Sequence, residues 1–128
     1  MSRKVVSISA DDTLRIVKEI MEGGSVRHLP VVRRGDLVGV VSQRDLLKAS
    51  LSNVMGLPAE EHSLFLEGVS ITEVMTSPPV TVEADSTVQA AAKLMAERKI
   101  GCLPVLEKGK FVGIVTETDV LRYFASLP

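Results

Sequence analysis

A hydroxyl residue followed three positions later by an aspartate occurs twice in the sequence, each time directly after an apolar run. The first pair is Ser42 and Asp45, and the second is Thr116 and Asp119. A serine or threonine at a helix start accepts a hydrogen bond from the first turn, and an acidic residue three positions on accepts one in return. The amides and the dipole at such a helix start attract phosphate, and the carboxylate could also accept both hydroxyls of a ribose.

Two interpretations of these pairs stay open. In the structural one they only cap helices, at about 1 kcal/mol each, and Gly39, three residues before the first pair, only lets two backbones pack closely. In the functional one, Gly39 makes room for a flat base or sugar, and Arg44 in the first helical turn donates to phosphate. The whole constellation recurs, with Gly113 in the second copy, which favours the functional interpretation.

Signals for catalysis or metal binding are scarce in this sequence. It holds no Walker loop and no His-Glu-x-x-His, Gly-x-Ser-x-Gly or Cys-x-x-Cys motif. The two histidines, His28 and His62, do not have the spacing of a ligand pair. The single cysteine, Cys102, begins an apolar strand and is expected to be a small buried side chain rather than a nucleophile. We therefore expect neither enzyme activity nor a metal site.

Length, composition and charge exclude further classes of protein. The chain has 128 residues, with 15 Lys and Arg against 16 Asp and Glu, so its formal charge is −1. A near-neutral chain lacks the basic surface that binds nucleic acid or anionic membranes. Hydrophobic residues make up 45% of the chain, and Trp is absent, which predicts a folded protein with an aliphatic core. No apolar run approaches the roughly 18 residues of a membrane span, and we expect a cytoplasmic protein without membrane insertion.

The two Ser/Thr-Asp pairs lie at equivalent positions of an internal repeat. The segment Val6–Leu47 aligns with Val80–Leu121 without a gap, at a constant offset of 74 residues, and 14 of the 42 aligned pairs are identical. Unrelated segments would match at roughly one position in fifteen. The sequence therefore predicts a duplicated unit.

Each copy of the repeat predicts the order strand, helix, strand, strand, helix. Short β-branched and apolar runs predict the strands, namely Val5–Ile8, Leu29–Val32 and Leu37–Val41 in the first copy and Val80–Val82, Leu103–Leu106 and Phe111–Val115 in the second. Polar turns that contain a glycine join the last two strands of each copy.

Helix boundaries follow from capping patterns. We expect Asp12 and Ser86 to be the N-caps of the first helix in each copy, and Ser70–Val74 to be a short helix with a capping box that leads into the second copy. Between the copies, Pro58–Glu67 predicts an additional amphipathic helix that ends at Gly68.

The repeated unit, its Leu-Pro-Val strand, the Gly-x-x-Ser/Thr-x-x-Asp element and the Val-Met-Thr lead-in resemble the tandem cystathionine β-synthase (CBS) domain pair, or Bateman module. The resemblance implies an α/β (α+β) fold in which two βαββα repeats pack through their sheets with pseudo-two-fold symmetry. Residues 1–128 would form one module, with the first repeat at 1–52, a helical insert or linker at 53–69 and the second repeat at 70–128.

The resemblance also implies two ligand clefts, each combining the base pocket of one repeat with the ribose carboxylate of the other. In one cleft Asp45 would bind the ribose, with Ser42 beside it and Arg44 near the phosphate. Its base pocket would consist of Thr76, Pro79, Val80, Ile100, Gly101 and Cys102, and Arg27 and His28 would be phosphate contacts. The other cleft would join Val5, Val6, Val26, Arg27 and His28 to Thr116, Thr118 and Asp119.

The two clefts differ in charge. The second repeat has Gly101-Cys102 where the first has Arg27-His28, and Thr118 where the first has Arg44. We therefore expect the Asp45 cleft to bind a phosphate-bearing ligand more tightly than the Asp119 cleft does.

The resemblance implies a non-catalytic regulatory or sensor module with no required cofactor. Its ligand would be AMP, ADP, ATP or S-adenosylmethionine, and binding would signal to an effector protein through a change of conformation. A homodimer is implied too, and exposed aliphatic residues on the last helix of each repeat would suit it (Leu47, Leu51, Leu121 and Phe124). The alternative is a ligand-free scaffold for dimerisation or partner docking.

Overall fold

The structure is a computed structural model, and it describes residues 5–24, 26–54 and 68–128, with side chains given outside 50–54. The chain divides into two compact units. The first unit is Val6–Pro79, and the second is Val80–Pro128 together with Val5.

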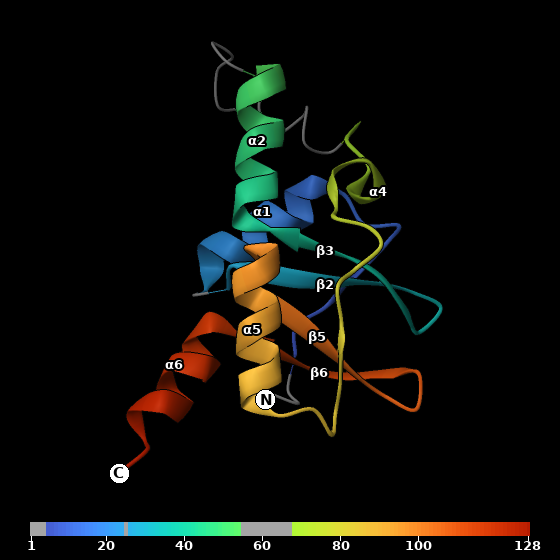
Figure 1. Ribbon diagram of the computed structural model, residues 1–128. Helices are drawn as coiled ribbons and strands as arrows, with labels where there is room; N and C mark the ends of the chain where they lie inside the picture. Colours follow the sequence, from blue (N-terminus) through green and yellow to red (C-terminus); the bar gives the residue numbers. More distant parts are fainter. Residues whose placement is uncertain (1–4, 25, 55–67) are drawn as a thin grey trace. The chain divides into compact units, whose positions relative to one another are not determined.

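The first unit contains a three-stranded sheet and, among its described residues, three helices (Figure 1). In chain order its elements are β1 (Ile8–Ser9), α1 (Leu14–Gly23), β2 (His28–Arg33), β3 (Asp36–Ser42), α2 (Gln43–Val54) and α4 (Ile71–Val74). In the sheet, β1 pairs with β2 in parallel, and β2 pairs with β3 in antiparallel fashion.

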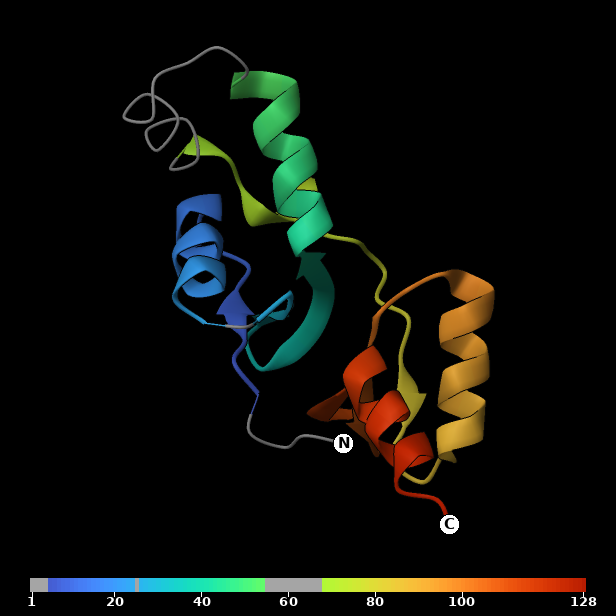
Figure 2. The same ribbon diagram turned by 90° about the vertical axis from the view of Figure 1, so that its left-hand side faces the viewer.

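The second unit repeats this topology. Its elements are β4 (Val82–Glu83), α5 (Val88–Arg98), β5 (Cys102–Glu107), β6 (Lys110–Thr116) and α6 (Glu117–Ala125). β4 is parallel to β5, and β5 is antiparallel to β6. α5 and α6 contact each other and pack against the sheet of their own unit (Figure 2). The mixed α/β class and the duplicated strand–helix–strand–strand–helix order predicted from the sequence are confirmed.

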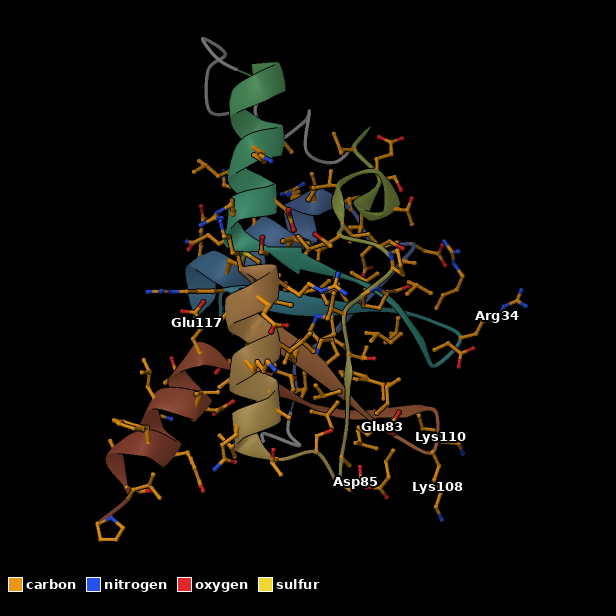
Figure 3. All side chains as sticks on the ribbon, viewed as in Figure 1. Arg34, Glu83, Asp85, Lys108, Lys110 and Glu117 are labelled. Atoms are coloured by element: carbon orange, nitrogen blue, oxygen red, sulfur yellow. The ribbon has the colours of Figure 1, made fainter. Side chains whose placement is uncertain are left out.

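The hairpins that join the last two strands of each unit are confirmed as well. Arg34-Gly35 and Lys108-Gly109 form two-residue turns in which all four residues have positive φ, between 52° and 84°. Such turns match the twist of the strands and place a glycine where a side chain would be strained. The Arg34 and Lys108 side chains project from the two hairpin tips (Figure 3).

Two predicted N-cap residues are wrong, and the predicted short helix after Ser70 is present without its capping box. The N-cap residues of α1 and α5 are Thr13 and Thr87, each one position after the predicted Asp12 and Ser86. The Asp12 carboxylate instead accepts the Ser9 N–H at 2.9 Å, so it closes the turn before the helix. At the start of α4, Ser70 caps no amide, because its hydroxyl bonds to the Thr72 hydroxyl at 2.8 Å.

The core is aliphatic, as predicted. In the first unit Leu14, Val17 and Met21 line the buried face of α1, against Leu29 and other aliphatic side chains of the sheet. The core of the second unit is smaller and centres on three side chains, Ala91, Met95 and Leu103.

The segment that leads into the second repeat packs in the first unit. Ile71 of α4 is fully buried in the first-unit core. Thr76 pairs with Val40 of β3, with the Val40 N–H donating to the Thr76 carbonyl at 3.1 Å and the Thr76 N–H donating to the Val40 carbonyl at 2.9 Å. The repeat in the sequence and the compact unit in space therefore have different boundaries, and the predicted repeat limits stay predictions.

The predicted helix at Pro58–Glu67 lies outside the described residues, as does the side chain of Leu51. In the part of the chain that the structure covers, every helix is too short or too polar to cross a lipid bilayer.

Candidate functional site

The Ser42–Asp45 pair forms the predicted capping box at the start of α2. The Ser42 N–H donates to Asp45 Oδ2 at 2.9 Å, and the Asp45 N–H donates to Ser42 Oγ at 3.1 Å. Within the described residues the other carboxylate oxygen, Oδ1, accepts no hydrogen bond. Helix capping therefore uses one oxygen of Asp45 and leaves the other for a ligand, so the two interpretations of this motif are compatible.

The Thr116–Asp119 pair forms a tighter version of the same box at the start of α6. The Thr116 N–H donates to Asp119 Oδ2 at 2.8 Å, and the Asp119 N–H donates to Thr116 Oγ1 at 3.3 Å. In addition, the Thr116 hydroxyl donates to the same Oδ2 at 3.1 Å. The single hydroxyl proton of Thr116 is therefore used inside the protein, which gives this copy one ligand donor fewer.

At the start of α2, fewer backbone amides remain to donate a hydrogen bond to a ligand than the sequence predicts. At α2, the Gln43 N–H donates to the Arg27 carbonyl at 2.8 Å, and the Asp45 N–H is used by Ser42. Of the first three amides, at most that of Arg44 remains for phosphate. Binding of a phosphate group at α2 must therefore depend mainly on cationic side chains.

Two arginines lie beside the first capping box. The Gln43–Arg27 backbone bond and the pairing of His28 with Ser42 bring residues 27 and 28 next to the start of α2. Arg27 and Arg44 are exposed, and His28 is half-buried. The first unit therefore brings Ser42, Arg44 and Asp45 together with Arg27 and His28 at one end of its sheet.

The second unit lacks this positive charge at the corresponding place. Its equivalent backbone bond joins the Glu117 N–H to the Gly101 carbonyl at 3.1 Å, and Cys102 pairs with Thr116. Gly101, Cys102 and Thr118 bring no cationic group to the Asp119 carboxylate. The charge difference noted in the sequence is thus present around the folded helix starts.

The remaining predicted site residues are mostly half-buried apolar side chains. Val26 packs against the first-unit core, and Val80 and Ile100 pack against the second. Val5 and Pro79 are half-buried, whereas Thr76 and Val6 are exposed. Thr76 and Pro79 of the predicted second repeat belong to the first unit, and Val5 is grouped with the second unit. The two complete clefts stay a prediction.

Gly39 favours the packing interpretation. A Cβ atom at this position would lie 2.5 Å from Met75 Sδ and 2.9 Å from the Thr76 carbonyl oxygen. The glycine therefore allows β3 to approach the chain segment at residues 75 and 76, and it is not needed to make room for a ligand.

Cys102 is buried at the start of β5, as predicted. Burial, and to a smaller extent the negative charge of Asp119, raise the pKa of its thiol to about 12. Because the thiolate is the reactive form, we expect iodoacetamide at pH 8 to alkylate the folded protein at least about a hundredfold more slowly than the urea-unfolded protein. Equal rates would contradict this assignment.

The same pKa shift has a consequence for stability. Since the folded state holds the thiol proton more tightly, this contribution to stability is complete below about pH 9 and is lost as the pH rises toward 12. Urea unfolding at several pH values should therefore show a decline above pH 9 that is smaller in Cys102→Ala.

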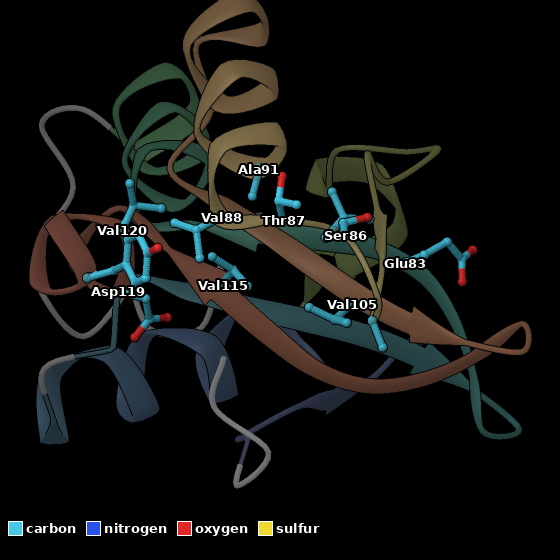
Figure 4. Close-up of a pocket in the computed structure, with 12 residues that line it drawn as sticks. Glu83, Ser86, Thr87, Val88, Ala91, Val105, Val115, Asp119 and Val120 are labelled. Atoms are coloured by element: carbon cyan, nitrogen blue, oxygen red, sulfur yellow. The ribbon is translucent and has the colours of Figure 1, made fainter. Parts of the chain in front are cut away.

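One feature near the second helix start was not found from the sequence. A pocket of about 230 Å³ lies between α5, α6 and the sheet of the second unit, and both Asp119 and Tyr123 line it (Figure 4). Tyr123 takes the place of Ala49 at the repeat offset of 74. A comparison of the aligned positions beyond Leu47 would have pointed to this exchange.

Comparison with known proteins agrees with this arrangement. The family model described as "CBS domain" matches residues 1–52 and 71–126. A CBS domain-containing protein of Dictyostelium discoideum is 37% identical over 123 residues, which cover 94% of this chain and 85% of that protein. An inosine-5′-monophosphate dehydrogenase of Korarchaeum cryptofilum is 32% identical, and the chain spans 22% of its length.

Solved structures agree as well. A CBS domain pair in complex with 5′-methylthioadenosine and S-adenosyl-L-methionine has a TM-score of 0.79 at 27% identity, covering 98% of this chain and 91% of the other. CBSX2 in complex with AMP has a TM-score of 0.79 at 29% identity, covering 98% and 92%. With two matches to the family model and the same duplicated topology, the chain belongs to the CBS domain family and is a CBS domain pair.

Proposed function

We propose that this protein is a non-catalytic regulatory module that binds an adenosine-containing ligand, with the free oxygen of Asp45 accepting hydrogen bonds from the ribose. The observation that carries the proposal is the divided use of this carboxylate, whose Oδ2 caps α2 while Oδ1 accepts no bond within the described residues. The AMP and S-adenosyl-L-methionine complexes of related CBS proteins support the choice of ligand class.

The charge around Asp45 favours a ligand that carries phosphate. Arg27 and Arg44 are both exposed, and their backbones lie at the start of α2. A guanidinium group donates paired hydrogen bonds to phosphate oxygens. We therefore propose AMP, ADP or ATP at Asp45, and a weaker or less anionic ligand at Asp119. In this proposal the base lies against the second-repeat residues named for that cleft from the family resemblance.

Isothermal titration of the full chain with AMP, ADP, ATP and S-adenosylmethionine tests the proposal. We expect saturable binding of at least one phosphate-bearing ligand, tighter than that of S-adenosylmethionine, because the latter lacks a phosphate and carries a positive sulfonium. No saturable heat with any of the four ligands would overturn the proposal and favour the scaffold alternative.

The proposal includes a homodimer that passes the signal to an effector protein. α6 exposes Leu121 and Phe124 to 66% and 73%, and α2 exposes Leu47 to 56%. Apolar side chains this exposed on the last helix of each repeat support an interface with another chain. Sedimentation velocity would test this, since a monomer at micromolar concentration would contradict it.

The absence of catalysis is also part of the proposal. It is supported by the lack of known catalytic motifs in the sequence and by the relatives named as enzymes, of which this chain spans only 22% to 23%.

A further inference from the structure

Lysines on two of the helices have an acidic partner one turn away. In α1, Lys18 Nζ lies 4.0 Å from Glu22 Oε1, and in α5, Lys93 Nζ lies 3.9 Å from Glu97 Oε1. Opposite charges four positions apart stabilise a helix. Support of the helix therefore accounts for both of these lysines.

α2, which follows directly on β3 (Figure 2), carries two cations at this spacing instead. Arg44 and Lys48 are four positions apart and both exposed, and like charges at this spacing destabilise a helix. Among the described residues, neither side chain forms an ion pair with a carboxylate. Support of the helix therefore does not account for this pair of cations.

The second repeat lacks such a pair. At the offset of 74, Thr118 takes the place of Arg44, and Arg122 takes the place of Lys48. Arg122 lies in the last turn of α6, where a cation interacts favourably with the carbonyl end of the helix. Lys48 has no such role, because α2 continues to Val54.

Lys48 neighbours both Arg44 and Asp45 on the helix surface, because residues three and four positions apart lie side by side. It lies one turn, about 6 Å, further along α2 than Arg44. Asp45 uses Oδ2 to cap the helix, and its Oδ1 accepts no bond within the described residues. A ribose bound at this Oδ1 would therefore have Arg44 beside it and Lys48 one turn beyond.

Arg27 adds a third cation at the same helix start. Its carbonyl accepts the Gln43 N–H at 2.8 Å, and its side chain is exposed. Against Arg27, Arg44 and Lys48 stands the single carboxylate of Asp45. The longer phosphate chains of ADP and ATP carry more negative charge than the single phosphate of AMP, so they balance this positive charge better.

We infer that Lys48 determines which nucleotide the Asp45 site prefers, because it binds the outer phosphates of ADP or ATP while Arg27 and Arg44 bind the first phosphate. The inference rests on the proposed nucleotide binding at Asp45 and specifies the ligand as a nucleoside di- or triphosphate. A lysine suits this task, since its ammonium group is a point charge on a flexible stem and can follow a phosphate chain.

Isothermal titration of the full chain with AMP, ADP and ATP, in the presence of EDTA and about 0.1 M salt, tests the inference. We expect ADP and ATP to bind at least about fivefold more tightly than AMP. Lys48→Gln removes one charge-assisted hydrogen bond and should weaken ADP and ATP about tenfold, with a change of less than about twofold for AMP. Lys48→Arg keeps the charge and should retain most of the preference.

Two controls separate a ligand contact from a structural effect. Arg122→Gln is the matched variant in the second repeat and should leave the tighter site unchanged. Urea unfolding should show that Lys48→Gln is as stable as the unmodified protein or slightly more stable, because the variant removes a like charge next to Arg44 and glutamine is as good a helix former as lysine.

Three results would overturn the inference while nucleotide binding itself stands. These are equal affinities for AMP, ADP and ATP, an equal loss for all three in Lys48→Gln, or a larger effect of Arg122→Gln. Inorganic tripolyphosphate that binds as tightly as ATP, with no effect of Asp45→Asn, would also overturn it and would show a general surface for polyanions, including acidic proteins. If none of the nucleotides binds, the proposed function fails, and this inference fails with it.

Discussion

Asp45→Asn is expected to weaken binding of the preferred adenine nucleotide about ten- to a hundredfold while the protein stays folded. The asparagine oxygen can still accept the Ser42 N–H, as Asp45 Oδ2 does at 2.9 Å, so the cap of α2 is kept. Its amide group then takes the place of Oδ1 and presents hydrogen-bond donors to the ribose hydroxyls. The loss of a charge-assisted hydrogen bond costs about 1.5–3 kcal/mol, and calorimetric titration measures the resulting change in the dissociation constant.

Two further variants make this test specific. Asp45→Ala removes the cap as well as the ligand contact and should lower the free energy of unfolding by about 1 kcal/mol, so it separates the two roles of the carboxylate. Asp119→Asn is the matched control in the second repeat and should weaken binding less, because Thr118 stands before this aspartate where Arg44 stands before Asp45. Unchanged binding by Asp45→Asn, or a larger effect of Asp119→Asn, would contradict the assignment of the tighter site.

Gly39→Ala is expected to destabilise the protein by about 1–3 kcal/mol. The new methyl group would lie 2.9 Å from the Thr76 carbonyl oxygen, and that oxygen already accepts the Val40 N–H. The backbone at this point cannot move away without losing the pairing. Met75 is a flexible side chain and can yield, but the carbonyl group cannot. Urea unfolding measures the change in the free energy of unfolding.

The matched control for this prediction is Gly23→Ala at the end of α1. A Cβ atom there has no neighbour within 4 Å, and alanine is the better helix former, so the variant should be neutral or slightly stabilising. An equal free energy of unfolding for Gly39→Ala and Gly23→Ala would contradict the close approach of residues 75 and 76 to β3.

Local patterns in the sequence predicted a large part of the fold. The Ser42–Asp45 and Thr116–Asp119 caps depend on residues three positions apart, and the two-residue turns depend on Gly35 and Gly109. In both cases the decisive interactions lie within a few residues, so the pattern contains nearly all of the information. Because the offset between the two copies is constant, each of these predictions applies to the equivalent residues of both copies.

Features that depend on distant residues were not predicted. The carbonyl of Arg27 uses the Gln43 amide from sixteen positions away, so the sequence could not show that this helix-start donor is occupied. The helix Ile71–Val74 has only four residues, and such a short helix has little stability of its own. Its place is determined by tertiary packing of Ile71.

The burial of Ile71 in the first unit also determines where the chain can be cut without loss of a core residue. A fragment that ends at residue 52 would lack Ile71, which is part of the first-unit core. A fragment that extends to Pro79 would include it. Residues 70–79, the first ten of the predicted second repeat, therefore fold with the first unit.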